Sequence, residues 1–232
     1  MEPDLVARLA EKERQLERYA TDLRTTFKAE RERARQLRSS YMATVRALAN
    51  AVEARDAYTG HHAERVAAYG LELAGAAGLA LAQDPQTEFG FLLHDVGKVA
   101  VPDAILFKPA PLTAEERILM ERHPVIGWEI LREIDFLDEA KVVVRHHHER
   151  WDGAGYPDGL SGEDIPPAAR VFAVADTLDA LTTDRPYRPA RPFADARAII
   201  AAGTGTQFSP DSVAALDAVS DARFEELRAG HE

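Results

Sequence analysis

The first fifty residues place apolar side chains at a seven-residue repeat within a highly charged segment. Two interleaved series form this repeat: Leu9, Leu16, Leu23, Glu30, Leu37 and Thr44 in one, and Glu13, Ala20, Phe27, Ala34, Tyr41 and Leu48 in the other. No proline or glycine interrupts the segment after Pro3. A heptad seam of this kind predicts a long helix over residues 1–50 that pairs as a dimeric coiled coil. The alternative is a solvated helix that folds back on its own domain.

From residue 51 onward the apolar pattern is typical of a compact helical domain. Val52, Val66, Tyr69 and Leu73 are spaced as on one face of an amphipathic helix. Further helices are predicted near Thr87–Val96 with an end at Gly97, after the capping box Thr113–Glu116, over Asp138–Glu149 and over Ala168–Leu181. No series of alternating strands occurs. The predicted fold class is all-α, with a compact helical domain over residues 51–232 preceded by the long coiled-coil helix over residues 1–50.

The composition excludes several classes of site. Apolar residues make up 46% and charged residues 29% of the 232-residue chain, as in an ordinary soluble globular protein. The absence of cysteine excludes a disulfide scaffold, a thiolate metal site and a cysteine nucleophile. No apolar run reaches the ~18 residues of a membrane span, and the N-terminus lacks the pattern of a secretory signal. We therefore expect a cytoplasmic protein without a membrane partner.

Charge is distributed unevenly along the chain. Residues 1–50 contain 11 Lys and Arg against 8 Asp and Glu, and the whole chain has a net charge of -11, so residues 51–232 carry -14. A strongly acidic body argues against binding long DNA or RNA, whose affinity depends on neutralising phosphates. A small anionic ligand held by metal ions and a few local arginines remains compatible with this charge.

Histidine and aspartate residues form the candidate chemistry of the helical domain. An apolar run ends in His94-Asp95, and Gly97-Lys98 follows at once. The predicted metal ligands are His62, His94, Asp95 and Asp176 for one ion and His123, His147 and His148 for a second, with Asp95 bridging. A single histidine is more often a hydrogen-bonded core or surface residue, so the prediction depends on the whole set. His61 and His146 are set aside, because adjacent helical side chains point about 100° apart.

Basic residues close to these ligands predict a phosphoryl substrate. Lys98 would neutralise charge on a phosphoryl oxygen; the alternative is an exposed lysine. Arg185 and Arg188 suit bidentate phosphate contacts; the alternative is a solvated basic turn. A hydroxide shared by two metal ions is a nucleophile suited to in-line attack on phosphorus. The expected reaction is therefore metal-dependent phosphoryl hydrolysis, with Asp95 and Lys98 as its catalytic residues.

The motifs His94-Asp95 with Gly97-Lys98, His123-Pro124, and His147-His148-Glu149 leading to Gly155-Tyr156-Pro157 resemble the HD-GYP family. Members of this family are bacterial phosphodiesterases that hydrolyse cyclic diguanylate, and the resemblance runs from about Val52 to Leu216. It implies the same two ligand sets and places Lys98 beside the scissile phosphate. The substrate contacts that it implies are Tyr156, Arg185, Arg188, Asp56 and Asp179. It also implies that the Gly-Tyr-Pro loop contacts diguanylate cyclase domains.

The chain departs from the family pattern at Tyr58. Family members with three metals resemble Glu-Thr-Gly-x-His, whereas here tyrosine stands in the place of the glutamate. A phenol is a poor replacement for a carboxylate ligand, so we predict two divalent transition-metal ions. The mixed ligands suit iron or manganese first, with nickel, cobalt or zinc as alternatives. The departure leaves open whether hydrolysis ends at the linear dinucleotide or at the mononucleotide.

Three functions are compatible with these features. The first is a cytoplasmic, dimeric, metal-dependent phosphodiesterase that hydrolyses cyclic diguanylate. The second is a binding module that senses the dinucleotide or docks a cyclase without turnover, and the intact ligand set with Lys98 weighs against it. The third is a phosphohydrolase of ordinary nucleotides, and the Gly-Tyr-Pro loop with Arg185 and Arg188 weighs against that. The first function is the prediction.

Overall fold

Helices form the architecture of the described chain. The computed structural model describes residues 3–55, 61–184 and 188–231. Within these ranges there is no β-strand, and an isolated bridge joins Thr204 and Phe208. The predicted all-α fold class is therefore confirmed. The chain divides into two compact units, Met1–Thr44 and Val45–Glu232.

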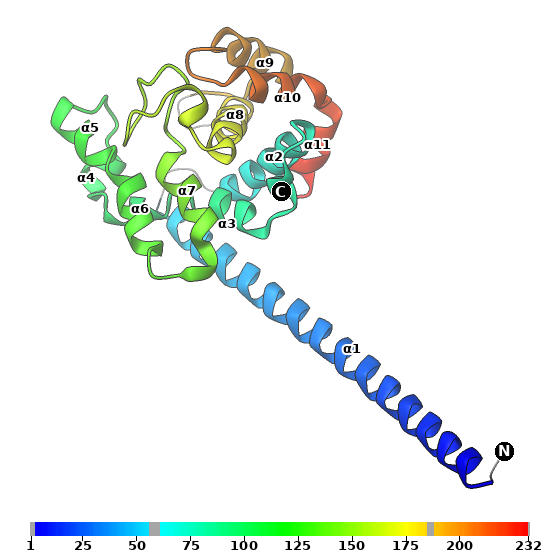
Figure 1. Ribbon diagram of the computed structural model, residues 1–232. Coiled ribbons are helices and arrows are strands. Elements are labelled where there is room, and N and C mark those ends of the chain that lie inside the picture. Colours follow the sequence, from blue (N-terminus) through cyan, green and yellow to red (C-terminus); the bar gives the residue numbers. More distant parts are fainter. Residues whose placement is uncertain (1–2, 56–60, 185–187, 232) are drawn as a thin grey trace. The chain divides into compact units, whose positions relative to one another are not determined.

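The first unit is the N-terminal part of α1 (Pro3–Glu53), a continuous helix of 51 residues (Figure 1). The apolar residues of the heptad seam are exposed along it, with Leu16 at 67%, Leu23 at 58% and Phe27 at 62%. Ion pairs one helical turn apart, such as Arg14 with Glu11, lie on its charged faces. The long N-terminal helix is confirmed, whereas its pairing with a second copy stays a prediction.

Four helices build the core of the second unit. They are α2 (His62–Ala76), α3 (Pro85–Leu93), α7 (Asp138–His146) and α8 (Pro167–Thr182). α2 packs against α3 and α8, and α3 packs against α7 (Figure 1). Val66, Tyr69 and Leu73 of α2 are fully buried, because spacings of three and four residues put them on one helix face. At the centre, the rings of Phe91 on α3 and Phe172 on α8 lie 5.4 Å apart between centroids.

Further helices of the second unit surround this core. They are α4 (Asp103–Leu106), α5 (Ala114–Met120), α6 (His123–Leu131), α9 (Phe193–Ala202), α10 (Pro210–Ala218) and α11 (Asp221–Ala229), with 3-10 turns η1 (Ala80–Gln83), η2 (Val96–Ala100), η3 (Asp135–Leu137) and η4 (Gly162–Asp164). The predicted capping box opens α5: the Thr113 side chain accepts from the Glu116 amide, and the Glu116 carboxylate accepts from the Thr113 amide. No helix in the described ranges combines the length and the apolar character of a membrane span.

The prediction that the helix before Gly97 extends to that glycine is wrong. α3 ends at Leu93, and Gly97 lies within η2. A Cβ atom at Gly97 would lie 1.9 Å from the carbonyl oxygen of His123 and 2.6 Å from the amide nitrogen of Gly127. Glycine is therefore required because η2 approaches the backbone of α6. This close approach brings Asp95, just before η2, next to His123 at the start of α6.

Candidate metal centre

The structure brings all seven predicted ligands together. Their ligating atoms form two groups, each with all atoms within 4.8 Å of one another: Asp95, His123, His147 and His148 in the first, and His62, His94 and Asp176 in the second. Asp95 connects the groups, because its Oδ2 atom lies 3.0 Å from His94 Nε2 and its Oδ1 atom lies 3.2 Å from His123 Nε2. This is the place that a bridging carboxylate would take.

The first group is arranged with lone pairs facing inward. The Nδ1 atoms of His123 and His147 lie 2.8 Å and 2.9 Å from the carbonyl oxygens of Met120 and Val144. A carbonyl oxygen only accepts, so each Nδ1 donates and each Nε2 of the neutral ring carries a lone pair. These two Nε2 atoms are nevertheless only 3.1 Å apart. Such a contact between two acceptors is stabilised when a cation lies between them.

The carboxylate of Asp95 is a second feature of this group that a cation would stabilise. Its Oδ1 atom is buried, 3.2 Å from His123 Nε2 and 3.9 Å from His147 Nε2, and has no hydrogen-bond partner in the described part of the chain. A buried acceptor without a partner costs free energy unless an ion satisfies it. Imidazole nitrogen and carboxylate oxygen are the donor types that divalent transition metals accept. The residues present therefore fit a metal ion.

The second group is oriented by contacts behind the imidazole rings. His94 Nδ1 donates to the Phe91 carbonyl at 2.8 Å, which turns Nε2 toward Asp95. His62 projects from the first turn of α2, with Nε2 3.4 Å from Asp176 Oδ1 and Nδ1 2.7 Å from Asp179 Oδ2. Partners of this kind fix the tautomer and the direction of a metal-binding histidine.

Asp179 lies behind His62. Its residue is 1% exposed, and Arg65 binds the carboxylate through Nε at 2.7 Å and Nη2 at 3.2 Å. Burial alone would favour the neutral acid, but the hydrogen bonds and charges of His62 and Arg65 lower the pKa of Asp179 to about 2. The family resemblance implies a substrate contact for Asp179, and that contact stays a prediction. The hydrogen bond to His62 Nδ1 supports a role in positioning His62.

Burial sets the protonation of the remaining ligands. Burial, together with the neighbouring imidazoles, holds the pKa of His147 well below its usual value and lowers the pKa of His148 to about 3. Both rings are therefore neutral and able to coordinate at pH 7. For Asp95, burial would raise the pKa, but the charges of His94 and Lys98 hold it well below its usual range. The Lys98 ammonium lies 2.8 Å from Asp95 Oδ2, at the edge of the centre.

The Gly-Tyr-Pro loop lies against the first group. The rings of Tyr156 and His148 are 4.8 Å apart between centroids and inclined by 35°, and the Tyr156–Pro157 peptide bond is cis. Burial, with the nearby Glu121 and Asp95 carboxylates, raises the pKa of Tyr156, so its phenol is neutral. Tyr156 thus lies beside His148, and the substrate contact that the family resemblance implies for it stays a prediction.

The other predicted substrate contacts are less completely described. Arg188 donates a hydrogen bond to the carbonyl of Ala180 near the end of α8. Asp56, Tyr58 and Arg185 lie outside the described residues. The roles predicted for these four residues therefore stay predictions.

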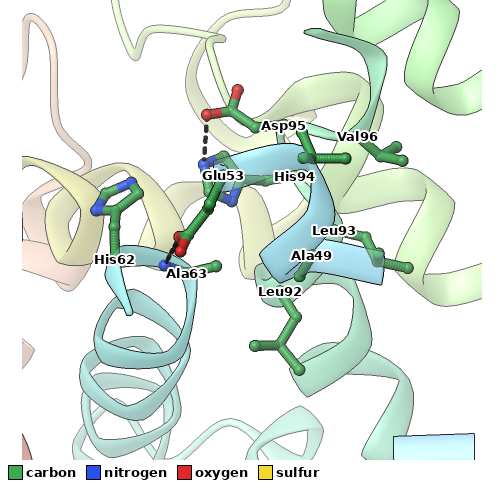
Figure 2. Close-up of a pocket in the computed structure, with 10 residues that line it drawn as sticks. Ala49, Glu53, His62, Ala63, Leu92, Leu93, His94, Asp95 and Val96 are labelled. Atoms are coloured by element: carbon green, nitrogen blue, oxygen red, sulfur yellow. Dashed lines mark hydrogen bonds and ion pairs between the residues drawn. The ribbon is translucent and has the colours of Figure 1, made fainter. Parts of the chain in front are cut away.

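A small cavity beside the second group shows a residue that the sequence analysis missed. The cavity has a volume of about 20 Å³, room for about one water molecule, and is lined by the end of α1 together with His62 and His94 (Figure 2). Glu53, in the last turn of α1, accepts a hydrogen bond from the backbone amide of Ala63. It therefore satisfies an amide in the first turn of α2, from which His62 projects.

Glu149 is a second residue that the sequence analysis missed. His146, Glu149 and Asp158 form a third group with ligating atoms within 4.8 Å of one another. In this group both Glu149 oxygens accept backbone amides, and Asp158 binds Arg145 through two hydrogen bonds of 2.8 Å and 2.7 Å. The carboxylates of the third group thus already have partners. The sequence feature that could have indicated Glu149 is its position as a glutamate at the entry to a loop rich in glycine, proline and aspartate.

Fold and site together define a helical domain with a candidate metal centre of histidine and aspartate. The HD domain family matches residues 46–211, more than half of the chain, and the chain belongs to this family. It is 43% identical over 182 residues to the 3'3'-cGAMP-specific phosphodiesterase 2 of Vibrio cholerae, a match covering 78% of this chain and 35% of that protein. It is also 43% identical over 175 residues to the cyclic di-GMP phosphodiesterase response regulator RpfG of Xanthomonas campestris, a match covering 75% of this chain and 46% of that protein. The predicted resemblance is therefore confirmed.

Solved structures show the same fold. The crystal structure of a cyclic GMP-AMP-specific phosphodiesterase of Vibrio cholerae superposes with a TM-score of 0.59 at 17% identity, covering 80% of this chain and 52% of that chain. At this identity the likeness concerns the fold alone. The chain spans about a third to a half of the length of the two curated relatives.

Proposed function

We propose that this chain is a metal-dependent phosphodiesterase that hydrolyses a cyclic dinucleotide, with cyclic diguanylate as its substrate. The observation that carries the proposal is the convergence of seven imidazole and carboxylate groups in two clusters connected by Asp95, whose buried Oδ1 atom has no hydrogen-bond partner among the described residues. Relatives named as phosphodiesterases of cyclic di-GMP and of 3'3'-cGAMP support the class of substrate. Of the two, cyclic diguanylate matches the Gly-Tyr-Pro resemblance.

The two groups would each hold one divalent ion, with Asp95 shared between them. Iron and manganese suit the mixed imidazole and carboxylate set, as do nickel, cobalt and zinc. Two ions held here would lower the pKa of a shared water to supply the nucleophile and would stabilise the leaving oxygen. The protein keeps His147 and His148 neutral through burial, so these ligands need lose no proton before they coordinate.

Residues at the edge of the centre would bind and orient the substrate. The Lys98 side chain is 21% exposed and points its ammonium at Asp95, so it can neutralise charge on a phosphoryl oxygen near that carboxylate. Tyr156, held neutral and against His148, would contact the dinucleotide from the loop side. Arg185 and Arg188 would complete the phosphate contacts.

The exposed seam of α1 supports a homodimer as the form of the enzyme. Seven of its large apolar side chains, from Leu9 to Leu48, are at least 39% exposed in the single chain. Pairing of two copies through this seam would bury them. A diguanylate cyclase domain that contacts the Gly-Tyr-Pro loop is the partner that the family resemblance supports.

The test combines metal analysis with turnover. Full-length protein loaded with iron or manganese is compared with His94→Ala and with the control His231→Ala, whose histidine lies outside both groups. Wild type and the control should bind about two ions per chain and convert cyclic diguanylate to linear product, whereas His94→Ala should lose metal and turnover. Binding of cyclic diguanylate without turnover in metal-replete wild type would favour the receptor function. Turnover of ordinary nucleotides or of 3'3'-cGAMP alone would overturn the proposed substrate.

A further inference from the structure

A buried carboxylate lies directly beside the candidate metal centre without pointing into it. Glu149 follows His148 in the chain, and its side chain is fully buried. A buried carboxylate is costly unless its charge is satisfied by strong hydrogen bonds or a cation. The imidazole of its group, His146, has Nδ1 3.9 Å from Glu149 Oε1, which is beyond hydrogen-bond distance.

The partners of Glu149 are backbone amides of the Gly-Tyr-Pro loop. Oε1 accepts from the amide of Asp158 at 2.8 Å, and Oε2 accepts from the amide of Leu160 at 3.0 Å. Hydrogen bonds to an ionised carboxylate are stronger than those between neutral groups. Each oxygen of this one side chain thus binds a different residue on the C-terminal side of Tyr156.

The N-terminal side of Tyr156 is held against the same stretch of backbone. The Tyr156 amide donates to the His148 carbonyl at 3.3 Å. A Cβ atom at Gly155 would lie 2.4 Å from the Arg150 amide nitrogen, so this glycine lies directly on the backbone of residues 148–150. Tyr156 is therefore fixed from both sides, and its ring lies on the ring of His148.

Glu149 could alternatively be a metal ligand, but coordination would compete with its hydrogen bonds to the loop amides. An ion held by His146, Glu149 and Asp158 would have to share carboxylate oxygens that already bind two amides and the Arg145 guanidinium. The cationic Arg145, with Nε 2.8 Å from Asp158 Oδ2, would also repel the ion. The contacts therefore favour loop anchoring over coordination.

We infer that Glu149 is a positioning residue that holds Tyr156 over the metal centre by binding the backbone amides of Asp158 and Leu160. The consequence for substrate rests on the proposed function, because it assumes that Tyr156 contacts the dinucleotide. The anchoring itself does not rest on that assumption. Hydrogen exchange measures the anchoring, and KM measures the consequence for substrate.

Glu149→Gln is the sharpest variant because it keeps the shape of the side chain. One oxygen would still accept an amide, but the new NH2 group would face the other amide, so a donor would meet a donor. We expect the amides of Asp158 and Leu160 to exchange hydrogen roughly tenfold faster, since one buried bond is replaced by an unsatisfied pair. KM for cyclic diguanylate should rise by about the same factor, with a smaller change in kcat and unchanged metal content.

The experiment follows the metal-loaded full chain by hydrogen exchange resolved to single amides, with metal content and steady-state kinetics measured on the same samples. Glu163→Gln, which changes an exposed acid of the same loop, is the matched control and should behave as wild type. If Glu149→Gln does not fold, Glu149→Asp replaces it, because it keeps the charge but withdraws the carboxylate by one methylene. Amide exchange, metal content and kinetics of that variant then test the inference.

The outcomes separate the inference from the proposed function. Unchanged exchange at both amides in the Glu149 variant would overturn the inference. So would loss of metal with loop protection retained, because that result assigns Glu149 to coordination. Faster exchange with metal retained supports the anchoring even if wild type turns over no cyclic dinucleotide, a result that would overturn only the proposed function.

Discussion

Asp179 binds the rear of His62, with its Oδ2 atom 2.7 Å from the Nδ1 atom of the imidazole. The two residues come from different helices, α8 and α2, and Arg65 on α2 holds the other side of the same carboxylate. A carboxylate behind a metal-binding imidazole fixes both the tautomer and the direction of the ring. Asp179 therefore belongs to the residues that build the candidate centre.

Replacing Asp179 with Asn should weaken metal binding about 10- to 100-fold, the usual effect of removing such a partner. The amide keeps the size of the side chain but removes the charge that His62 and Arg65 bind. Competition with a chelator of known affinity measures the change. The control Asp217→Asn, on an exposed position of α10, should leave the affinity unchanged. Equal affinities of both variants and wild type would show that the carboxylate does not position His62.

Removal of metal should lower the thermal stability of the protein. A cation held there would stabilise the contact between His123 Nε2 and His147 Nε2 and would satisfy Asp95 Oδ1, a buried atom with no hydrogen-bond partner in the part of the chain that the structure describes. At a free metal concentration about 100 times Kd, binding stabilises the folded state by about 2.7 kcal/mol. For a domain of this size that corresponds to about 5–10 °C in Tm.

Differential scanning fluorimetry of chelated and reloaded protein measures this shift. The same comparison on His94→Ala should show a much smaller shift, because that variant lacks a ligand of the second group. A wild-type Tm that does not respond to metal would contradict the stabilising role of the ions.

The seven candidate ligands could be named from the sequence because their signals are local. Histidine and aspartate are recognisable by type, and the spacing of apolar residues places them on helices. Their meeting was a hypothesis about tertiary structure, and the seven side chains do converge. The partners of Asp179 and Glu149 were not predictable in the same way. Asp179 and Arg65 are 114 residues apart, and Glu149 binds backbone amides, which carry no residue-type signal.

The error at Gly97 has a similar cause. A glycine after an apolar run is a common signal for a helix end, and the chain does leave α3 nearby. The reason for glycine at this position is instead the backbone of α6, which no local pattern indicates.

Gly97→Ala should therefore destabilise the domain by about 2–3 kcal/mol, because the new methyl group meets backbone atoms that cannot rotate away. Displacement of η2 should also move Asp95 from His123 and weaken metal binding. Urea denaturation and metal titration measure the two effects. Gly75→Ala is the control: the space around its Cβ is open, and alanine in a helix should stabilise by about 0.5–1 kcal/mol. Similar free energies of unfolding for both variants would contradict the steric argument.

The capping box of α5 should show a pH dependence. Lys108 and the Thr113 amide lower the pKa of Glu116 from its usual value. A carboxylate with a lowered pKa in the folded state stabilises the fold above its unfolded pKa, near 4.5, and loses this contribution as the pH falls through the folded value. A carboxyl carbon NMR titration should therefore place the midpoint of Glu116 below the usual value of a glutamate, near 4.5. Lys108→Ala should raise the Glu116 midpoint toward that usual value, and an unchanged midpoint would show that the ion pair is not its main cause.

The exposed seam of α1 predicts the oligomeric state. Leu16 and Leu23 occupy equivalent positions of successive heptads and are 67% and 58% exposed in the single chain. A charge at such a position opposes pairing, because it would be buried against its copy in the partner helix. Light scattering coupled to size exclusion should give a dimer for wild type and a monomer for Leu23→Glu. Arg18→Glu also introduces an acid but lies off the seam, and it should remain dimeric. A monomeric wild type would leave α1 as a solvated helix, and the candidate centre, whose ligands all come from residues 62–176 of one chain, would be unaffected.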